Sequence, residues 1–301
     1  MIGDSVALHL DGTMLSAARA GRQNFVNRLA AALASVGRTL RIAQDNPLAR
    51  VAALRGAPGL WHMIEPPGPG GLTLRRSYVG PFWHVERVAA RWDWPVAREV
   101  FDPAGIDPDR AARFAAFWRA QVFPGLVPDR AGHVFVPLQA RLLERRGFQA
   151  ESPLDMLRAV LGRWPGRRVE AGLHPGVDYP GAELAALEGL AARHPALSVS
   201  RGRSVALMAS ADLVVAENSA MAFQGLLLDK PALLFAGIDF HHAAASVPRD
   251  GAAAAFDGCE RLRVDPAVYL WWFLKQRAIN AGAPEAEAQI LAALRRGGWD
   301  L

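Results

Sequence analysis

The stretch Asp212–Asp239, DLVVAENSAMAFQGLLLDKPALLFAGID, decides the fold that we expect for this chain of 301 residues. It reads as an apolar strand at 213–216, a polar corner at 217–219, a helix at 220–228 and a second buried strand at 232–236. A strand, a helix and a strand in this order are the repeating unit of parallel sheets that carry helices on their faces. The polar corner then lies at the carboxyl end of a strand, which is the edge where open parallel sheets bind ligands.

The polar corner consists of Glu217, Asn218 and Ser219. A turn into a helix presents free backbone N–H groups and the positive end of the helix dipole, and both favour a phosphate. Asn and Ser are also frequent helix caps. Two interpretations therefore stay open, a simple cap and the edge of a phosphate or nucleotide-sugar site.

A second polar corner follows the strand that we predict at 168–173. His174 and Pro175 come directly after that strand, and Gln139 closes the strand predicted at 133–139. Because the carboxyl ends of parallel strands share one edge, we expect these residues to lie near the corner at 217–219. A histidine there can donate a hydrogen bond to a phosphate oxygen, or it can only satisfy backbone groups.

Strand and helix patterns alternate twice along the chain, so we expect an α/β protein with two Rossmann-like domains that face one another across a cleft. The N-terminal domain is expected at 1–127 and the second domain at 128–265. Helices at 266–301 are expected to cross back to the first domain. The linker is expected at 123–129, a segment that contains two prolines and a glycine.

The other predicted elements follow from hydrophobic periodicity and from Gly and Pro positions. Further strands are predicted at 6–10, 39–43, 60–64 and 197–200. Further helices are predicted at 14–36, 48–54, 85–92, 108–121, 153–161, 182–194, 205–209, 266–281 and 283–296. Residues 66–71 read as a Pro/Gly loop. The aromatic segment 78–84 reads as a packed loop or short strand, or as a wall of an acceptor site.

For a general base we look to the first domain. Asp11 follows the strand predicted at 6–10, and Glu65 follows the strand predicted at 60–64. Either carboxylate is placed to accept a proton at a ligand-binding edge. Each is equally explained as a turn or cap residue, and the sequence does not rank the two.

The charge pattern disfavours a nucleic-acid partner. The chain has 34 Lys and Arg against 29 Asp and Glu, a formal charge of +5. The arginines are scattered among acids and form no basic tract. An anionic small molecule or an anionic membrane face accounts for the charge equally well.

Other sequence features limit the class of protein. The single cysteine, Cys259, excludes an internal disulfide and a cysteine zinc site. No apolar run reaches the roughly 18 residues of a membrane helix. The amino terminus has no basic region before its apolar segment, which argues against a secretory signal. We therefore expect a cytoplasmic protein.

No pattern indicates a metal or a bound cofactor, and we expect neither. His241 and His242 are adjacent, so on a regular element they point apart. Gly68 and Gly70 match the first two glycines of a dinucleotide loop, but Thr73 stands where the third belongs. Neither a Walker loop nor the nucleophile elbow of serine hydrolases is present.

Three short motifs and the C-terminal end suggest a family. Val134–Gln139 (VFVPLQ), Leu173–Pro175 (LHP) and Val215–Ser219 (VAENS), with Lys230–Leu234 (KPALL) behind them, stand in an order and spacing that resemble the bacterial capsular polysaccharide biosynthesis proteins, which are Kdo-transferase-like. The segment Tyr269–Trp272 and Gly298-Trp299 are similar to the tail of that family. The resemblance covers about residues 130–301.

This resemblance implies a GT-B fold, with the donor in the C-terminal domain and the acceptor in the other. It implies a metal-independent glycosyltransferase of capsule or surface polysaccharide biosynthesis, using a nucleotide-activated acidic sugar such as CMP-Kdo. His174 and Ser219 would bind the phosphate and cytidine side of the donor. Gln139, Pro175, Glu217 and Asn218 would complete the site. A glycan or glycolipid acceptor is implied, and peripheral contact with the inner membrane face or an export complex is a further hypothesis.

The chain departs from the family pattern at two points. Gly172 and Leu173 precede His174 where the family often has a lysine, and Glu217 precedes Asn218. A different donor, or a loss of catalysis, would fit these departures. Two other functions stay open: a non-catalytic glycan- or nucleotide-binding relative that assists polysaccharide assembly or export, and another sugar-nucleotide enzyme such as an epimerase.

Overall fold

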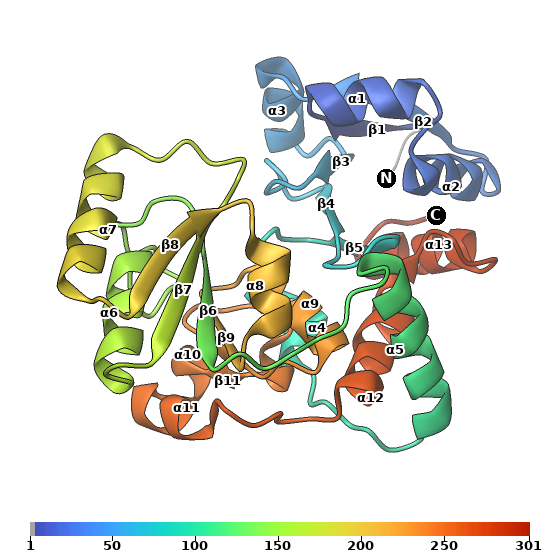
Figure 1. Cartoon of the computed structure of the whole chain (residues 1–301). Helices are drawn as coiled ribbons and strands as arrows, with labels where there is room; N and C mark the ends of the chain where they lie inside the picture. Colours follow the sequence, from blue (N-terminus) through green and yellow to red (C-terminus); the bar gives the residue numbers. More distant parts are fainter. Residues whose placement is uncertain (1–3) are drawn as a thin grey trace. The chain divides into compact units, whose positions relative to one another are not determined.

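The computed structural model describes residues 4–301 and divides into two compact units, each built on a six-stranded sheet with helices around it (Figure 1). Unit 1 comprises the described residues up to Pro95 together with Phe273–Leu301, and unit 2 comprises Val96–Trp272. The expected fold class, an α/β chain with two Rossmann-like domains, is confirmed.

Unit 1 contains a mixed sheet. Its elements are β1 (Ser5–Leu10), α1 (Gly12–Arg19), α2 (Asn24–Ala34), β2 (Thr39–Gln44), α3 (Pro47–Leu54), β3 (Gly59–His62), β4 (Gly71–Arg76), β5 (Phe82–Glu86), β12 (Ile279–Asn280) and α13 (Ala286–Arg296). The strand order is β12-β5-β4-β3-β1-β2. Strands β2, β1, β3 and β4 are parallel, whereas β5 and β12 pair in antiparallel fashion. The parallel part follows the strand order of flavodoxin-like sheets.

The core of unit 1 needs the C-terminal end of the chain. On β1, Val6 and Leu8 alternate with residues of the opposite face and are fully buried. Helix α13 places Ile290 and Leu294 in the same cluster, both without exposure. The indole N–H of Trp299 donates to the carbonyl oxygen of Gly70 at 3.0 Å. The first strands and the last helix therefore share one core.

Several predictions for unit 1 are wrong. The helix predicted at 14–36 is two helices, because Gly21 takes a left-handed conformation (φ 68°) between them. The helix predicted at 85–92 is absent from the structure, which has strand β5 and then a 3-10 helix at Arg91–Asp93. All four residues from Phe82 to Val85 are buried, and continuous burial of aromatic and β-branched side chains favours a strand. Strand β4 was not predicted.

Unit 2 contains a parallel sheet. Helix α4 (Pro95–Arg98) lies at the junction of the units. The further elements are α5 (Pro108–Val122), β6 (His133–Leu138), α6 (Pro153–Arg163), β7 (Arg168–Leu173), α7 (Gly181–Arg193), β8 (Leu197–Arg201), α8 (Ser204–Ser210), β9 (Leu213–Ala216), α9 (Ala220–Gly225), β10 (Ala232–Leu234), β11 (Ala245–Ser246), α10 (Val247–Asp250), α11 (Ala252–Gly258) and α12 (Pro266–Leu270). Figure 1 shows α6 and α7 on one side of this sheet and α8 on the other.

The strand order of unit 2 creates a ligand-binding edge. The order is β11-β10-β9-β6-β7-β8, and every pairing is parallel. In chain order this is the 3-2-1-4-5-6 arrangement of dinucleotide-binding folds, read from the β8 side. The chain moves outward from β6 to β8 and then returns to place β9 on the other side of β6. Such a reversal opens a crevice at the carboxyl ends of the central strands.

The boundary between the units lies at Pro95–Val96 rather than at 127–128 as expected. Two histidines hold the start of unit 2 in place. Nε2 of His241 donates to the carbonyl oxygen of Ala97 at 2.9 Å, and Nε2 of His242 donates to that of Glu99 at 2.8 Å. Burial lowers the pKa of both rings, to about 4 for His242, so both are neutral at pH 7. Both histidines therefore hold the backbone at Ala97 and Glu99 in place through hydrogen bonds.

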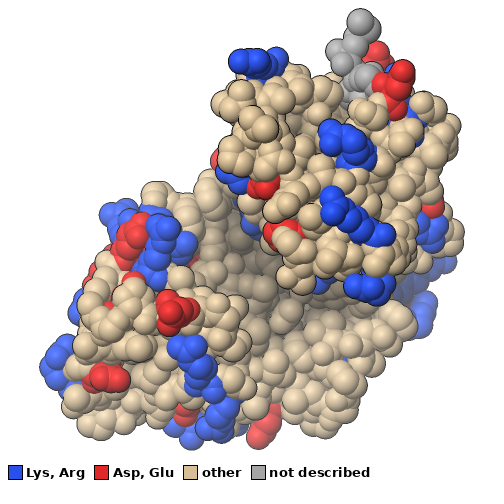
Figure 2. Space-filling view, turned by 90° about the horizontal axis from the view of Figure 1, so that it is seen from above, with Lys and Arg blue, Asp and Glu red and all other residues tan. Residues whose placement is uncertain are grey.

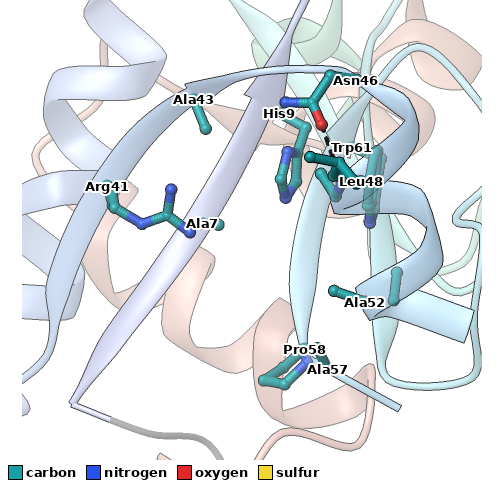
Figure 3. Close-up of a pocket in the computed structure, with 12 residues that line it drawn as sticks. Ala7, His9, Arg41, Ala43, Asn46, Leu48, Ala52, Ala57, Pro58 and Trp61 are labelled. Atoms are coloured by element: carbon teal, nitrogen blue, oxygen red, sulfur yellow. Dashed lines mark hydrogen bonds between the residues drawn. The ribbon is translucent and has the colours of Figure 1, made fainter. Parts of the chain in front are cut away.

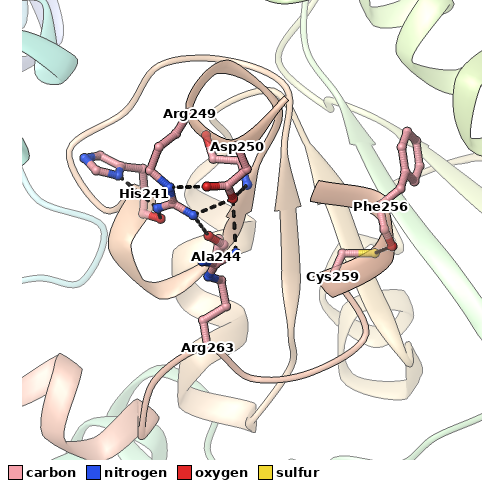
Figure 4. Close-up of polar contacts among 8 residues, drawn as sticks. His241, Ala244, Arg249, Asp250, Phe256, Cys259 and Arg263 are labelled. Atoms are coloured by element: carbon pink, nitrogen blue, oxygen red, sulfur yellow. Dashed lines mark hydrogen bonds and ion pairs between the residues drawn. The ribbon is translucent and has the colours of Figure 1, made fainter. Parts of the chain in front are cut away.

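An arginine fixes the turn that presents these histidines. Arg249 donates to the carbonyl oxygens of His241 and Ala244 at 2.5 and 2.9 Å, and it pairs with Asp250 at 2.7 Å (Figure 4). Arg263 pairs with the same carboxylate at 3.1 Å. The alanine-rich segment 243–255 therefore has a defined structure, in which β11, α10 and the start of α11 form.

The helix predicted at 266–281 is also wrong. Helix α12 ends at Leu270 and continues as a π-helical segment, Trp271–Gln276. The chain passes from unit 2 to unit 1 inside this segment, between Trp272 and Phe273. Strand β12 follows and pairs with β5. A π-helical turn alters the direction of the side chains, and here it coincides with the change of unit.

Charged residues of both signs are interspersed on the face shown in Figure 2, and uncharged surface separates them. This agrees with the scattered arginines of the sequence. Within residues 4–301, no helix is long and apolar enough to cross a membrane.

Candidate functional site

A cavity of about 830 Å³ lies at the carboxyl edge of the unit 2 sheet. Its walls come from the segments that follow β6, β7, β8 and β9, so it occupies the crevice expected at the strand reversal. The lining residues are Leu126, Pro137, Leu138, Gln139, Gly172, His174, Pro175, Gly202, Arg203, Ser204, Val205, Ala206, Ser219, Ala220, Met221 and Gln224.

The structure brings together four of the residues that the sequence singled out. Gln139, His174, Pro175 and Ser219 all line this cavity, although they lie up to about 80 positions apart in the chain. Each follows a parallel strand, and parallel strands place their ends on one edge. Their proximity follows from topology, while their role in binding remains a prediction.

The ring of His174 is fixed by its own turn. Its Nδ1 accepts the backbone N–H of Gly176 at 3.1 Å. In a neutral imidazole the proton then sits on Nε2, so this nitrogen is a hydrogen-bond donor. The turn therefore presents His174 as a donor at the cavity.

Tyr179 ties two of the strand ends together. Its hydroxyl accepts the backbone N–H of His174 at 2.9 Å and donates to the carbonyl oxygen of Leu138 at 3.2 Å. Leu138 precedes Gln139, so one buried hydroxyl sets the spacing of both cavity residues. Burial raises the pKa of Tyr179, and the hydroxyl stays protonated.

Gln139 and Ser219 contribute different chemistry. Oε1 of Gln139 is buried and has no hydrogen-bond partner among residues 4–301. A buried acceptor without a partner is uncommon and is explained when a ligand supplies the donor. Oγ of Ser219 accepts the backbone N–H of Met221 at 3.3 Å and caps α9. Ser219 is thus both a helix cap and a cavity residue, so the two interpretations of the corner are compatible.

Glu217 and Asn218 do not line the cavity. The Glu217 side chain is only 1% exposed and accepts a hydrogen bond from Nε2 of Gln149. Arg146 lies 3.4 Å from its other oxygen. The expectation that Glu217 contacts the substrate therefore does not match its position, because the carboxylate points into the interior beside these partners.

Burial raises the pKa of Glu217 to about 7 against the nearby positive charge of Arg146. The folded protein therefore holds a proton that the unfolded chain, with an ordinary value of 4.5, releases earlier. The protonated Glu217 side chain therefore contributes stability that is fully present below about pH 4.5 and is lost as the pH rises through 7. The loss is about 3 kcal/mol.

We expect Glu217→Gln to be more stable than the wild type at pH 8 by about 3 kcal/mol relative to their difference at pH 4.5. The variant side chain does not titrate in this range, so the gap between the free energies of unfolding of variant and wild type widens as the pH rises. Urea unfolding at both pH values measures it. Glu188→Gln, which removes an exposed carboxylate of the same unit, is the control and should show a constant gap. A constant gap for Glu217→Gln would contradict the raised pKa.

Sequence reasoning missed three polar residues of the cavity. Arg203, Ser204 and Gln224 line it. Arg203 follows Gly202, whose φ of 80° turns the chain after β8. The rule that identified His174, a polar residue directly after a predicted strand, points to Arg201 instead, because the predicted strand ends at Ser200. Gln224 lies within α9, and no local signal marks it.

In unit 1, Asp11 and Glu65 both follow strands of the sheet, but they differ in their partners. Asp11 caps α1 by accepting the backbone N–H of Met14 at 3.1 Å, and its Oδ2 lies 3.5 Å from Nδ1 of His62. Glu65 accepts the backbone N–H of Ala89 at 2.6 Å. The Asp11 side chain is 67% exposed, so it remains open to solvent beside a histidine that the sequence did not single out.

Within residues 4–301, no group of three or more His, Cys, Asp or Glu side chains is placed to hold a metal ion.

Comparison with known proteins gives structural likeness alone. No protein-family model matches this sequence, and no curated protein does either. KpsC beta Kdo 2,7 transferase of Thermosulfurimonas dismutans has a TM-score of 0.54 and 14% identity, over 88% of this chain and 88% of that chain. KpsC beta Kdo 2,4 transferase of that organism has a TM-score of 0.49 and 15% identity, over 88% and 89%. The first likeness shows that this chain shares the fold of a Kdo transferase, so the fold implied by the capsule-family resemblance is confirmed.

Proposed function

We propose that the protein is a glycosyltransferase that binds a nucleotide-activated sugar in the unit 2 cavity. The observation that carries this proposal is the convergence of Gln139, His174, Arg203 and Ser219 on one cavity at the strand reversal of a parallel sheet. Nucleotides bind at this place in doubly wound folds. The shared fold with a Kdo transferase supports the same reading.

Size and chemistry fit a nucleotide sugar. The volume of about 830 Å³ is within the range of roughly 300–1,000 Å³ that small-molecule sites occupy. Arg203 supplies a charge and His174 a hydrogen-bond donor for phosphate oxygens. Among the described residues that line the cavity there is no carboxylate. This composition favours neutralisation of the phosphate by the protein over neutralisation by a carboxylate-bound divalent cation.

In the proposed reaction an acceptor hydroxyl attacks the anomeric carbon of the donor sugar. The new glycosidic C–O bond forms as the bond to the phosphate oxygen breaks, and the nucleotide leaves with the negative charge. We assign Asp11 as the base that takes the hydroxyl proton, because it is exposed and His62 stands beside it. Both carboxylates accept a backbone N–H, Glu65 at 2.6 Å and Asp11 at 3.1 Å, and the shorter bond makes Glu65 the weaker candidate.

The resemblance of the sequence to capsule enzymes directs the choice of substrates. We propose a CMP-linked acidic sugar such as CMP-Kdo as donor and a glycan or glycolipid of a capsule or another surface polysaccharide as acceptor. Peripheral contact with a membrane or an export complex belongs to the same proposal.

The first test is a thermal-shift titration with CMP, UDP and GDP, followed by incubation with CMP-Kdo and a Kdo-terminated glycolipid. We expect one of the three nucleotides to stabilise the protein. We expect the incubation to release the nucleotide from the donor and to add the sugar to the acceptor. Tight nucleotide binding without transfer to any acceptor would assign the non-catalytic role instead. If none of the three nucleotides binds, the site assignment is wrong.

A further inference from the structure

Unit 1 has a cavity of its own, about 320 Å³ in volume, on one face of its sheet beside α3 (Figure 3). Strands β1, β2 and β3 form its floor, and α3 with the segment 57–58 forms its wall. The lining residues are Ala7, His9, Arg41, Ala43, Asn46, Leu48, Ala49, Ala52, Ala53, Ala57, Pro58 and Trp61. None of these residues belongs to the proposed nucleotide site of unit 2.

The cavity exists because small side chains stand where a parallel sheet normally carries large ones. Ala7 on β1 and Ala43 on β2 face it, and Ala49, Ala52 and Ala53 line it from α3. The opposite face of β1 is filled by large aliphatic side chains that pack in the unit 1 core. The two faces of one strand therefore differ, and only this face leaves room for an apolar group.

Exposed apolar side chains of α3 lie beside the cavity. Leu48 lines it and is 83% exposed, and Val51 and Leu54 of the same helix are also exposed. These three residues recur at a spacing of three, so they form one ridge along α3. Isolated exposed apolar side chains need no explanation, but three of them on a short helix beside an apolar cavity indicate an apolar occupant.

One cation faces this apolar space. Arg41 is the charged residue of the lining. Its guanidinium forms no hydrogen bond or ion pair with any of residues 4–301. Its neighbours differ, because Arg38 pairs with Asp4 at 3.1 Å and Arg50 pairs with Asp45 at 2.5 Å. Figure 3 shows the Arg41 guanidinium extended across β1 toward Ala7.

A rigid aromatic pair backs the cavity. The rings of His9 and Trp61 stack with their centroids 4.0 Å apart and their planes 14° apart. Burial lowers the pKa of His9, the Gln44 backbone opposes this effect, and the Arg41 charge adds to the lowering. The imidazole is therefore neutral at pH 7, and Arg41 supplies the positive charge of this wall.

We propose that this cavity is a binding site for a single-chain anionic amphiphile, that is, a carboxylate or phosphate monoester on a short apolar chain. The anionic head pairs with Arg41, and the chain lies against the alanines and leaves over Leu48. A volume of about 320 Å³ is at the lower end of the range of roughly 300–1,000 Å³ for ligand pockets, which suits one short chain. This site is independent of the proposed transferase reaction.

The test uses the full chain and isothermal titration calorimetry with octanoate and octyl phosphate below their micellar concentrations. Octanol and octylammonium, which lack the anionic head, are the matched probes. We expect saturable binding of both anions and weaker binding of octanol. Arg41→Gln should weaken octanoate binding about tenfold and leave octanol unchanged. Ala43→Leu, which fills the cavity, should abolish binding of octanoate, octyl phosphate and octanol.

Two substitutions in unit 1 serve as controls. Arg22→Gln removes an exposed arginine outside the cavity, and Ala34→Leu enlarges an exposed alanine of α2. Neither should change octanoate binding. The proposal is wrong if octanol and octanoate bind equally in the wild type, or if Arg22→Gln acts as strongly as Arg41→Gln. Circular dichroism checks that Ala43→Leu folds; if it does not, the Arg41→Gln comparison decides.

Sedimentation with phosphatidylcholine vesicles that carry lysophosphatidic acid, a phosphate monoester on one acyl chain, identifies the source of the amphiphile. Vesicle binding that octanoate competes away and that Ala43→Leu abolishes assigns a membrane lipid. Octanoate binding without vesicle binding assigns a free carboxylate or phosphate. Vesicle binding that Ala43→Leu leaves intact, together with no octanoate binding, would overturn the proposal. All of these outcomes are independent of nucleotide binding in unit 2, so this inference and the proposed function can fail separately.

Discussion

His174→Ala should weaken nucleotide binding by roughly 10- to 100-fold, because the lost contact is a hydrogen bond to a charged phosphate. Nδ1 of His174 is occupied by the Gly176 N–H, so Nε2 is the donor that the substitution removes. Ser219→Ala should also weaken binding, and it should cost about 1 kcal/mol of stability through the lost α9 cap. Titration calorimetry with the nucleotide that stabilises the wild type measures both effects.

His194→Ala is the matched control for His174→Ala. His194 ends α7 and precedes β8, so it belongs to the opposite edge of the same sheet. We expect wild-type nucleotide affinity for this variant. His174→Gln, which keeps a side-chain N–H donor, should recover part of the affinity. Unchanged affinity in both His174→Ala and Ser219→Ala would remove the cavity from the proposed mechanism.

Gly68→Ala should destabilise unit 1 by about 3 kcal/mol, the upper range for overpacking. A Cβ atom at this position would lie 1.9 Å from the carbonyl oxygen of Ala53 and 3.0 Å from the backbone nitrogen of Leu54. Both atoms belong to the backbone of α3, so neither can rotate away as a side chain would. The loop between β3 and β4 would have to move off the helix.

Hydrogen exchange resolved by peptide measures this effect, because it reports unit 1 and unit 2 separately. Gly12→Ala is the control. A Cβ atom there meets no other atom within 4 Å, so the stability of unit 1 should be maintained. Equal protection of unit 1 in Gly68→Ala and Gly12→Ala would contradict the close packing of this loop on α3.

Unit 2 could be predicted well from the sequence. Its strands are short apolar runs that end at polar residues, and β7 and β9 have the predicted bounds. One rule, that parallel strands end on one edge, placed Gln139, His174 and Ser219 at a common cavity. The rule depends only on local sequence and on the general topology of α/β sheets, which explains its success here.

Unit 1 could be predicted only in part, because its later strands depend on distant partners. Strand β5 lies between β4 and β12, and the latter comes from residues about 200 positions further on. Local periodicity cannot indicate such a pairing. The direction of the Glu217 side chain was missed for a related reason, since Gln149 and Arg146, its partners, lie about 70 positions earlier. The exact bounds of the domains likewise follow from contacts such as that of His241 with Ala97.

The shared core of β1 and α13 has a consequence for synthesis on the ribosome. Unit 2 is one continuous stretch, so its whole sequence is translated before Phe273. Strand β1 is translated before unit 2, yet Val6 and Leu8 lack Ile290 and Leu294 until α13 has been made. In the nascent chain unit 2 can therefore mature while the first strand of unit 1 still waits for its partner helix.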